Sequence, residues 1–190
     1  MNKVFSEYEI KETSIKFKDD EKSNRAGCVG SLEETLDSKV ITKKCEGIES
    51  VVAVKGKGTG ELKVSIHMPY EMYNKIYGMN LNSLITGVVG YGQKSIHNKF
   101  ALTGKVYDEE GNCKLKAYPN CIMKEGIARK IENGSEEIAE IDLTISLNPD
   151  EEGFAMYEAL VSGLDTGTAD ELTESWMTNF TTDLVQNVDA

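Results

Sequence analysis

The sequence predicts a mainly β, α+β domain, a β-sandwich or barrel with one or two short α-helices. Three observations predict this class. Apolar and polar residues alternate with a period of two in several segments, glycine-containing turns separate these segments, and only two segments begin with a proline placed to start a helix. The 190 residues can bury roughly 70% of the unfolded surface in one core, so a single domain spanning 1–190 is expected.

The first part of the chain is expected to hold a strand, a long loop and a hairpin. Ile15 and Phe17 alternate with polar residues, which indicates a half-buried strand around them. Residues 19–47 are polar, contain glycine and lack clear periodicity, so they are expected to form a long loop or arm. The segments 51–54 and 62–68, separated by the turn GKGTG, then predict a hairpin.

A short helix and a glycine-rich loop follow. Pro69 suits the first turn of a helix, and apolar residues after it recur at three- and four-residue spacing, which predicts a helix over 69–77. The loop 79–98 is unusually apolar, so it is either buried against its own chain or docks on another chain. Its candidate inter-subunit residues are Leu84, Ile85, Val88, Val89 and Tyr91.

The next segments predict a second hairpin and a long strand. The hairpin joins 99–107 to 113–118 through DEEGN, and its polar face is basic. Pro119 indicates an edge or a bulge before an irregular strand over 121–127. Residues 138–147 alternate most cleanly, with one apolar and one polar face.

The C-terminal part is expected to contain a second helix and an acidic arm. Asn148 can cap a helix and Pro149 fits its first position, which predicts a helix near 149–162. In the arm, 164–190, apolar residues recur every four positions, but its threonines also permit an extended form, so both conformations stay open. A Trp and a Phe so near the terminus indicate docking rather than fraying.

Charge is distributed unevenly along the chain. The net charge is −11, yet residues 132–190 hold fifteen acidic residues and no Lys or Arg; the other 17 acidic and all 21 basic residues give residues 1–131 a charge of +4. A net acidic chain is repelled by phosphate, which argues against stable nucleic-acid binding.

Catalytic and metal-binding patterns are absent from the sequence. The four cysteines form no CxxC pair and His67 and His97 are isolated, so no metal and no cofactor are expected. Without a partner for either histidine, nucleophilic catalysis has no anchor, and the chain is not expected to be an enzyme. The N-terminus lacks an apolar signal segment, which favours reduced thiols, and no apolar run is long enough to span a bilayer.

Two stretches carry a resemblance to a known family. The order of elements, with HMPYEMYNKIYGMN (67–80) and KFALTGKVYDEEGNCKLKAYPNCIMKEG (99–126), resembles the major tail tube proteins of long, flexible-tailed (siphovirus-type) bacteriophages over about residues 40–162. The resemblance implies a subunit whose sheets join into hexameric rings, which stack into the tube that conducts the genome. It also implies copies of itself, the tape measure, the tail terminator and the distal tail protein as partners, DNA that passes without specific binding, no membrane contact, synthesis in the bacterial host cytoplasm and a place in the virion tail.

An acidic channel lining would suit such a tube, because a wall that repels phosphate does not retain the DNA. The polar side of the strand at 138–147 supplies the candidates, and an outward-facing solvated surface explains them nearly as well. The candidate lumen-facing residues are Glu136, Glu140 and Asp142.

Two alternatives stay open. A tube protein of a contractile tail or of a type VI secretion-like needle would share the ring architecture. A β-sandwich carbohydrate-binding module would instead stack Tyr91, Tyr118 and Trp176 on sugar rings. Aromatic residues make up only 7% of the chain and are dispersed, which weakens the second alternative.

Overall fold

A computed structural model describes residues 4–131, 133–134, 138–165 and 167–186. Its strands are β1 (Glu9–Phe17), β2 (Asn24–Arg25), β3 (Cys28–Cys45), β4 (Ile48–His67), β5 (Phe100–Tyr107), β6 (Cys113–Met123), β7 (Ile141–Leu147) and β8 (Tyr157–Leu160). Its helices are α1 (Tyr70–Ile76) and α2 (Ala169–Thr178), with 3₁₀ turns η1 (Val161–Gly163) and η2 (Thr182–Val185). Neither helix in this part of the chain is long and apolar enough to cross a membrane.

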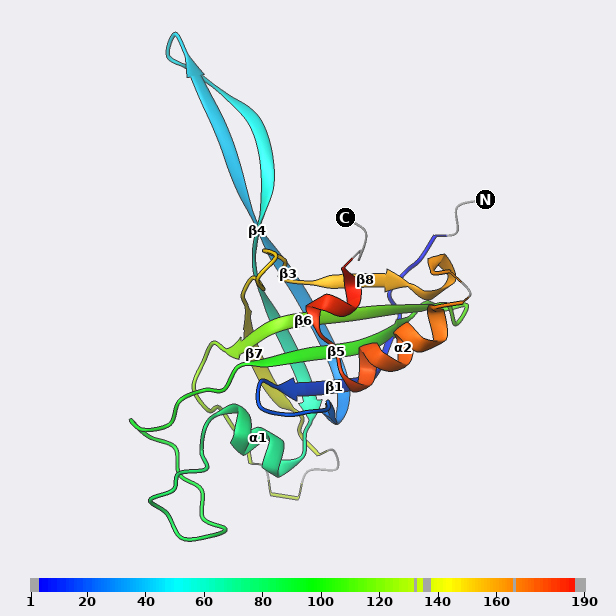
Figure 1. Cartoon of the computed structure of the whole chain (residues 1–190). Coiled ribbons are helices and arrows are strands. Elements are labelled where there is room, and N and C mark those ends of the chain that lie inside the picture. The colour runs from blue at the N-terminus through cyan, green and yellow to red at the C-terminus, as the bar shows by residue number, and fades with distance from the viewer. Residues whose placement is uncertain (1–3, 132, 135–137, 166, 187–190) are drawn as a thin grey trace.

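The strands confirm a mainly β fold built on one antiparallel sheet. The strand order is β2-β1-β5-β6-β7-β4-β3, and β8 pairs with β6 beside this path. The sheet curls so that β1 comes near β3, although the two strands are not paired (Figure 1). The curl encloses most of the core, and α1 packs at one end of it.

Two apolar clusters hold the fold together. The larger lies inside the curled sheet and includes Leu62 of β4, Phe100 of β5 and Tyr73 of α1. The smaller lies on the other face of β6, where Trp176 of α2 and Phe180 cover that strand. The strand β6 is therefore covered on both faces.

Several predicted elements are confirmed. Ile15 and Phe17 are buried residues of β1. The helix predicted over 69–77 is α1, whose first turn closes through a 3.0 Å hydrogen bond from the Tyr73 N–H to the Pro69 carbonyl oxygen. The predicted second hairpin is β5–β6, and the cleanly alternating segment is β7, which begins three residues later than expected.

The irregularity predicted at Pro119 is a bulge at which β6 changes partner. Before it, residues 114–117 pair with β8, and after it, residues 121–123 pair with β7. The register with β5 also shifts at this point. The Asn120 amide donates a 2.9 Å hydrogen bond to the Pro149 carbonyl, which fastens the next segment to the bulge.

The helix expected near 149–162 is wrong, because this segment is a turn followed by β8. The Asp150 carboxylate accepts hydrogen bonds from the backbone N–H groups of Glu152 (3.0 Å) and Phe154 (2.9 Å) and from the Tyr157 hydroxyl (2.5 Å). Such bonds give the backbone an alternative to a helix. The second helix is α2, in the tail whose conformation the sequence left open.

The first predicted hairpin and the long loop before it are also wrong. Residues 19–47 contain β2 and β3, and β4 runs through the glycines of GKGTG while pairing with β3. The turn lies instead at Glu46 and Gly47, both at positive φ. Gly58, with φ +71°, marks a bulge, and a Cβ there would lie 2.4 Å from the Gly153 carbonyl oxygen.

The basic face predicted for the second hairpin is not a solvated surface. Lys116 is only 5% exposed, and its Nζ lies 2.9 Å from Glu7 Oε1 and 3.2 Å from Glu34 Oε2. Lys114 Nζ lies 2.7 Å from the same Glu7 oxygen. Burial alone would lower the pKa of Lys116, but the hydrogen bond to Glu7 and the charge of Glu34 raise it above its usual value. A partly buried ion cluster therefore forms around Lys116 of β6.

Candidate assembly surface

The most prominent surface feature is the outer part of the β3–β4 hairpin, residues 38–56, here called the distal hairpin. Figure 1 shows it projecting from one end of the body. In the described chain its strands pair only with each other, since β7 reaches β4 only from Gly60 to Ile66. An isolated two-stranded ribbon is marginally stable in water. The distal hairpin therefore presents two free edges and two uncovered faces.

One face of the distal hairpin is apolar. Residues directly opposite in an antiparallel pair share a face, and successive residues alternate. Val40 stands opposite Val54, Thr42 stands opposite Val51, and a bulge adds Val52 on the same side. This valine face carries four side chains that are 53% to 66% exposed: Val40, Val51, Val52 and Val54.

The other face of the distal hairpin carries three lysines around the facing pair Ile41 and Ala53. Lys39 stands directly opposite Lys55, and Lys43 lies four residues further along β3 on the same side. All three side chains are exposed, and none forms an ion pair with another described residue. Like charges that face each other across a strand pair destabilise it. This lysine face therefore holds positive charge without a local counter-charge.

The apolar loop 79–98 has a fixed base. The Gly90 N–H donates a 3.1 Å hydrogen bond to the Met79 carbonyl. His97 Nδ1 lies 3.1 Å from the carbonyl oxygen of the last β6 residue, and its Nε2 lies 3.0 Å from the Tyr91 hydroxyl. The rings of His97 and Tyr91 also stack, with centroids 6.0 Å apart. These contacts tie the loop to the sheet without any regular secondary structure.

The five candidate residues of this loop have different environments. Ile85 is 79% exposed, and Leu84 and Val88 are also exposed at the loop tip. Val89 instead packs against the main core, and Tyr91 belongs to the loop base. The loop lies at the end of the body opposite the distal hairpin (Figure 1). The base of the loop is thus attached to its own chain, and docking of the uncovered tip on another chain stays a prediction.

The polar side of β3, β4 and β7 forms a third surface, here called the polar sheet face. Three register rows cross it: Ser31–Ser65–Asp142, Glu33–Lys63–Thr144 and Thr35–Glu61–Ser146. Lys63 lies 3.9 Å from Glu33. Lys124, which follows β6, donates a hydrogen bond to Glu61, and this bond holds the pKa of Glu61 below its usual value. Both lysines of this surface therefore have a carboxylate partner.

Two of the three candidate lumen residues lie at the polar sheet face. Asp142 is exposed on β7 and accepts a 2.5 Å hydrogen bond from the Ser65 hydroxyl. Glu140 precedes β7, and its carboxylate lies so close to Gly30 of β3 that a Cβ there would be 2.1 Å from Oε1. Glu136 lies outside the described residues. That this face lines a channel stays a prediction.

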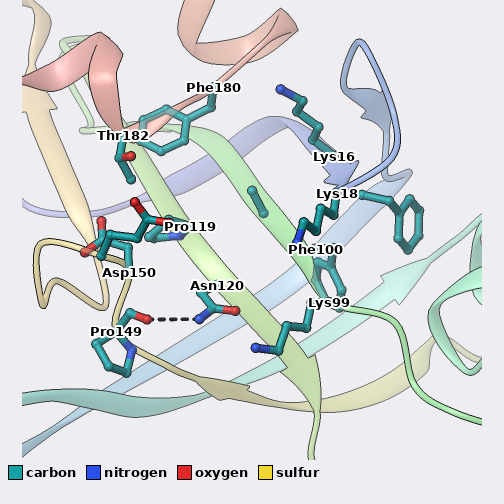
Figure 2. Close-up of a pocket in the computed structure, with 13 residues that line it drawn as sticks. Lys16, Lys18, Lys99, Phe100, Pro119, Asn120, Pro149, Asp150, Phe180 and Thr182 are labelled. Carbon is teal, nitrogen blue, oxygen red and sulfur yellow. Dashed lines mark hydrogen bonds between the residues drawn. The ribbon is translucent and has the colours of Figure 1, made fainter.

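A pocket of about 520 Å³ lies beside the β6 bulge (Figure 2). Lys16, Lys18 and Lys99 line one side of it, and Asp150 lies across from them. Lys16 donates a hydrogen bond to Asn179, and Asp150 is engaged by its own turn. The lining contains neither His nor Cys.

Side chains that could carry other chemistry are dispersed. His67 is exposed at the end of β4, and His97 is part of the loop base. Among the described residues, no three His, Cys, Asp or Glu side chains are grouped so that they could hold a metal ion. The free thiols of Cys28, Cys113 and Cys121 are exposed, half-buried and buried, respectively.

The aromatic residues proposed for sugar binding do not form a platform. Trp176 is 1% exposed and its Nε1 donates a 3.1 Å hydrogen bond to the Lys116 carbonyl. Tyr118 is 2% exposed and its hydroxyl donates to Glu34. Of these three aromatic residues only Tyr91 is accessible, so they do not present the joint stacking surface that this alternative requires.

The distal hairpin is the surface that the sequence analysis missed. Its signal is present, because the β-branched runs VIT (40–42) and VVAV (51–54) flank a Glu-Gly pair at 46–47. A glycine-containing pair between β-branched runs is typical of a hairpin turn. Lysines placed between these runs hid the alternation.

Comparison with known proteins adds one structural likeness. No protein-family model matches the chain, and no curated protein matches it. Among solved structures, the chain is similar to the cryo-EM structure of the anti-feeding prophage cap (AFP tube terminating cap), with 12% sequence identity and a TM-score of 0.42. The match covers 84% of this chain and 96% of that chain. Similarity at this level establishes neither a common fold nor a common function.

Proposed function

We propose that this protein is a structural tube subunit, the major tail tube protein of a siphovirus-type bacteriophage, which assembles with its own copies into stacked hexameric rings. The observation that carries the proposal is the distal hairpin with its valine face. Exposed apolar surface and free strand edges are liabilities in a protein that stays monomeric, and a neighbouring subunit removes both. The apolar residues whose exposure is unfavourable in a single chain thus form the contact between chains in this proposal.

The positions of the apolar protrusions favour a head-to-tail contact. The distal hairpin and the tip of loop 79–98 lie at opposite ends of the body (Figure 1). A contact between unlike surfaces is heterologous, and it generates closed rings or open filaments according to its rotation. In the proposed tube, the distal hairpin reaches the adjacent ring, and Leu84, Ile85 and Val88 become buried against a neighbour.

The proposal assigns the polar sheet face to the channel. Asp142 and Glu140 add negative charge there, while Lys63 and Lys124 are each paired with a glutamate. A phosphate passing such a wall meets no unpaired lysine, so it finds no attractive site from which transport must release it. This arrangement supports DNA passage without specific binding.

The remaining parts of the proposal follow from the same role. The subunit acts as a wall, so it requires no cofactor and performs no catalysis. Its partners are copies of itself, the tape measure protein, the tail terminator and the distal tail protein. It is made in the bacterial host cytoplasm and ends in the virion tail.

Electron microscopy of the purified protein tests the proposal. Negative-stain images taken after concentration are expected to contain rings or tubes of uniform diameter. A preparation that holds only small separate particles, under conditions in which the chain is folded, would contradict the role. Images of particles with a closed centre would contradict the channel but not the assembly.

A further inference from the structure

We infer that the lysine face of the distal hairpin binds the acidic C-terminal region of a second copy, with the outward side of α2 as its counter-surface. This inference rests on the proposed self-assembly and specifies one contact within it. It concerns the face of the hairpin opposite the valine face, so it adds a polar contact to the apolar one.

The lysine face lacks any neutralising group of its own. Its three cations lie within one short ribbon, and Lys39 and Lys55 face each other directly. The two acidic residues of the distal hairpin do not compensate them, because Glu46 is in the turn and Glu49 lies 3.9 Å from Lys44. A partner that brings carboxylates relieves the Lys–Lys repulsion and strengthens the ribbon at the same time.

The outward side of α2 offers the complementary charge. The helix buries Trp176 and packs Leu172 against the small core, which leaves Asp170, Glu171 and Glu174 exposed. None of these three forms an ion pair with another described residue. No Lys or Arg occurs after Lys130, so the C-terminal region has no cation of its own to neutralise them.

These two surfaces do not meet within one chain. Figure 1 shows the distal hairpin extending away from the body, whereas α2 lies against the body on the outer side of β5 and β6. Their charges are therefore complementary between copies rather than within a copy. A nucleic acid is the less suitable partner for the lysine face, because the whole chain carries a net charge of −11 that repels phosphate.

A charge-swap experiment tests the contact. Three variants are compared with the wild type by sedimentation velocity: K39E/K43E/K55E, D170K/E171K/E174K, and a chain carrying both triplets. Each triplet alone is expected to raise the concentration needed for assembly by about tenfold, as expected for the loss of three solvent-exposed ion pairs. The chain with both triplets is expected to assemble near the wild-type concentration, because each contact is restored with reversed sign.

Matched controls separate this contact from a general effect of charge. K18E/R25E/K99E makes the same change in net charge at three exposed basic residues outside the distal hairpin and loop 79–98, and it is expected to leave assembly unchanged. If D170K/E171K/E174K unfolds α2, D170N/E171Q/E174Q replaces it in the experiment. This neutral variant is expected to weaken assembly less than charge reversal does. Raising the salt from about 0.05 M to about 0.5 M is expected to weaken wild-type assembly more than that of K39E/K43E/K55E.

The outcomes distinguish this inference from the proposed function. Assembly that is unaffected by either triplet, or not restored in the double-triplet chain, overturns the inference and leaves the tube subunit intact. Absence of wild-type assembly overturns the proposed function instead. Binding of a DNA duplex by the wild type that K39E/K43E/K55E abolishes would assign the lysine face to phosphates and overturn the inference.

Discussion

The distal hairpin and the C-terminal tail both extend from the central sheet and both carry large apolar residues, yet they differ in what those residues contact. In the tail, Trp176 and Phe180 pack edge-on with centroids 4.9 Å apart and cover β6. In the distal hairpin, the valine face contacts no part of the described chain that buries it. The tail completes the fold of its own chain, whereas the valine face of the distal hairpin stays exposed in the described chain.

The difference shows that apolar content alone does not reveal where a segment docks. The tail folds back because β6 presents the apolar side chains of Leu115 and Ala117 on the outer face of the sheet, where the tail covers them. The distal hairpin instead extends away from the body, and within the described chain its strands pair only with each other (Figure 1). The same hydrophobic driving force stabilises the single chain in one region and, in the proposed tube, the contact between chains in the other.

The largest expected effect is on the tail. Trp176→Ala removes a fully buried aromatic side chain and is expected to lower the free energy of unfolding by about 3–5 kcal/mol. Urea denaturation followed by circular dichroism measures it. Val52→Ala, a loss of apolar surface on the valine face, serves as control and is expected to cost less than about 1 kcal/mol in the unassembled chain. Equal losses of unfolding free energy in the two variants would contradict the difference between the two regions.

Hydrogen exchange compares the distal hairpin with the tail in the wild-type protein, without any substitution. In the unassembled chain, amides of the distal hairpin are expected to exchange faster than those of α2 and β6, because the ribbon pairs only with itself. In assembled particles, exchange is expected to slow at residues 38–56 and at the loop tip near Ile85, while α2 keeps its protection. Unchanged exchange of the distal hairpin on assembly would mean that it contacts nothing.

The N-terminal segment resembles the tail, because it too folds back onto its own sheet. Burial opposes ionisation of Glu7, but hydrogen bonds from Lys114 and Lys116 hold the pKa of Glu7 below its ordinary value of 4.5. A lowered folded-state pKa means that the stabilisation is complete above about pH 4.5 and is lost as the pH falls through the folded-state pKa. The carboxylate is half exposed, so Glu7→Gln is expected to cost only about 1 kcal/mol at neutral pH.

Unfolding curves measured between about pH 3 and pH 7 check this dependence. The wild type and Glu7→Gln are expected to differ at neutral pH and to converge in acid. A constant difference across the range would show that Glu7 contributes through packing rather than through its charge.

The smallest expected effect on assembly belongs to the polar sheet face. Glu140→Lys with Asp142→Lys is expected to slow genome ejection roughly severalfold while tubes still form, because unpaired lysines would retain phosphate. Timed DNA release from complete virions measures it, with Glu151→Lys and Glu152→Lys as a charge-matched control outside this face. Unchanged ejection would place the polar sheet face away from the channel.

Much of the fold could be predicted from the sequence, and each failure has a local physical cause. Strands with a strict period of two, such as β7, and the helix that follows Pro69 were predicted within a few residues. The prediction of a helix near 149–162 failed because the Asp150 side chain accepts hydrogen bonds from the backbone of its own turn. Residues that can cap a helix can also stabilise such a turn. Two strands were predicted where the structure has the single long strand β4, because its glycines form a bulge rather than a turn.

The candidate site was less predictable than the fold. The loop residues were identified as an apolar group, but the sequence could not show that Val89 turns inward while Ile85 stays exposed. The burial of Lys116 depends on carboxylates from Glu7 and Glu34, which lie far from it in the sequence. The valine and lysine faces required the register of β3 against β4, which no alternation in one strand reveals.

Sedimentation velocity over a range of protein concentrations tests the central claim most directly, when the wild type is compared with V40T/V51T/V52T/V54T. Threonine keeps the β-branched shape that favours a strand but removes the apolar surface. The wild type is expected to form species much larger than a monomer as its concentration rises, and the variant is expected to stay folded and monomeric. A wild type that remains a single monomeric species at the highest concentration, or a variant that assembles equally well, would contradict the account.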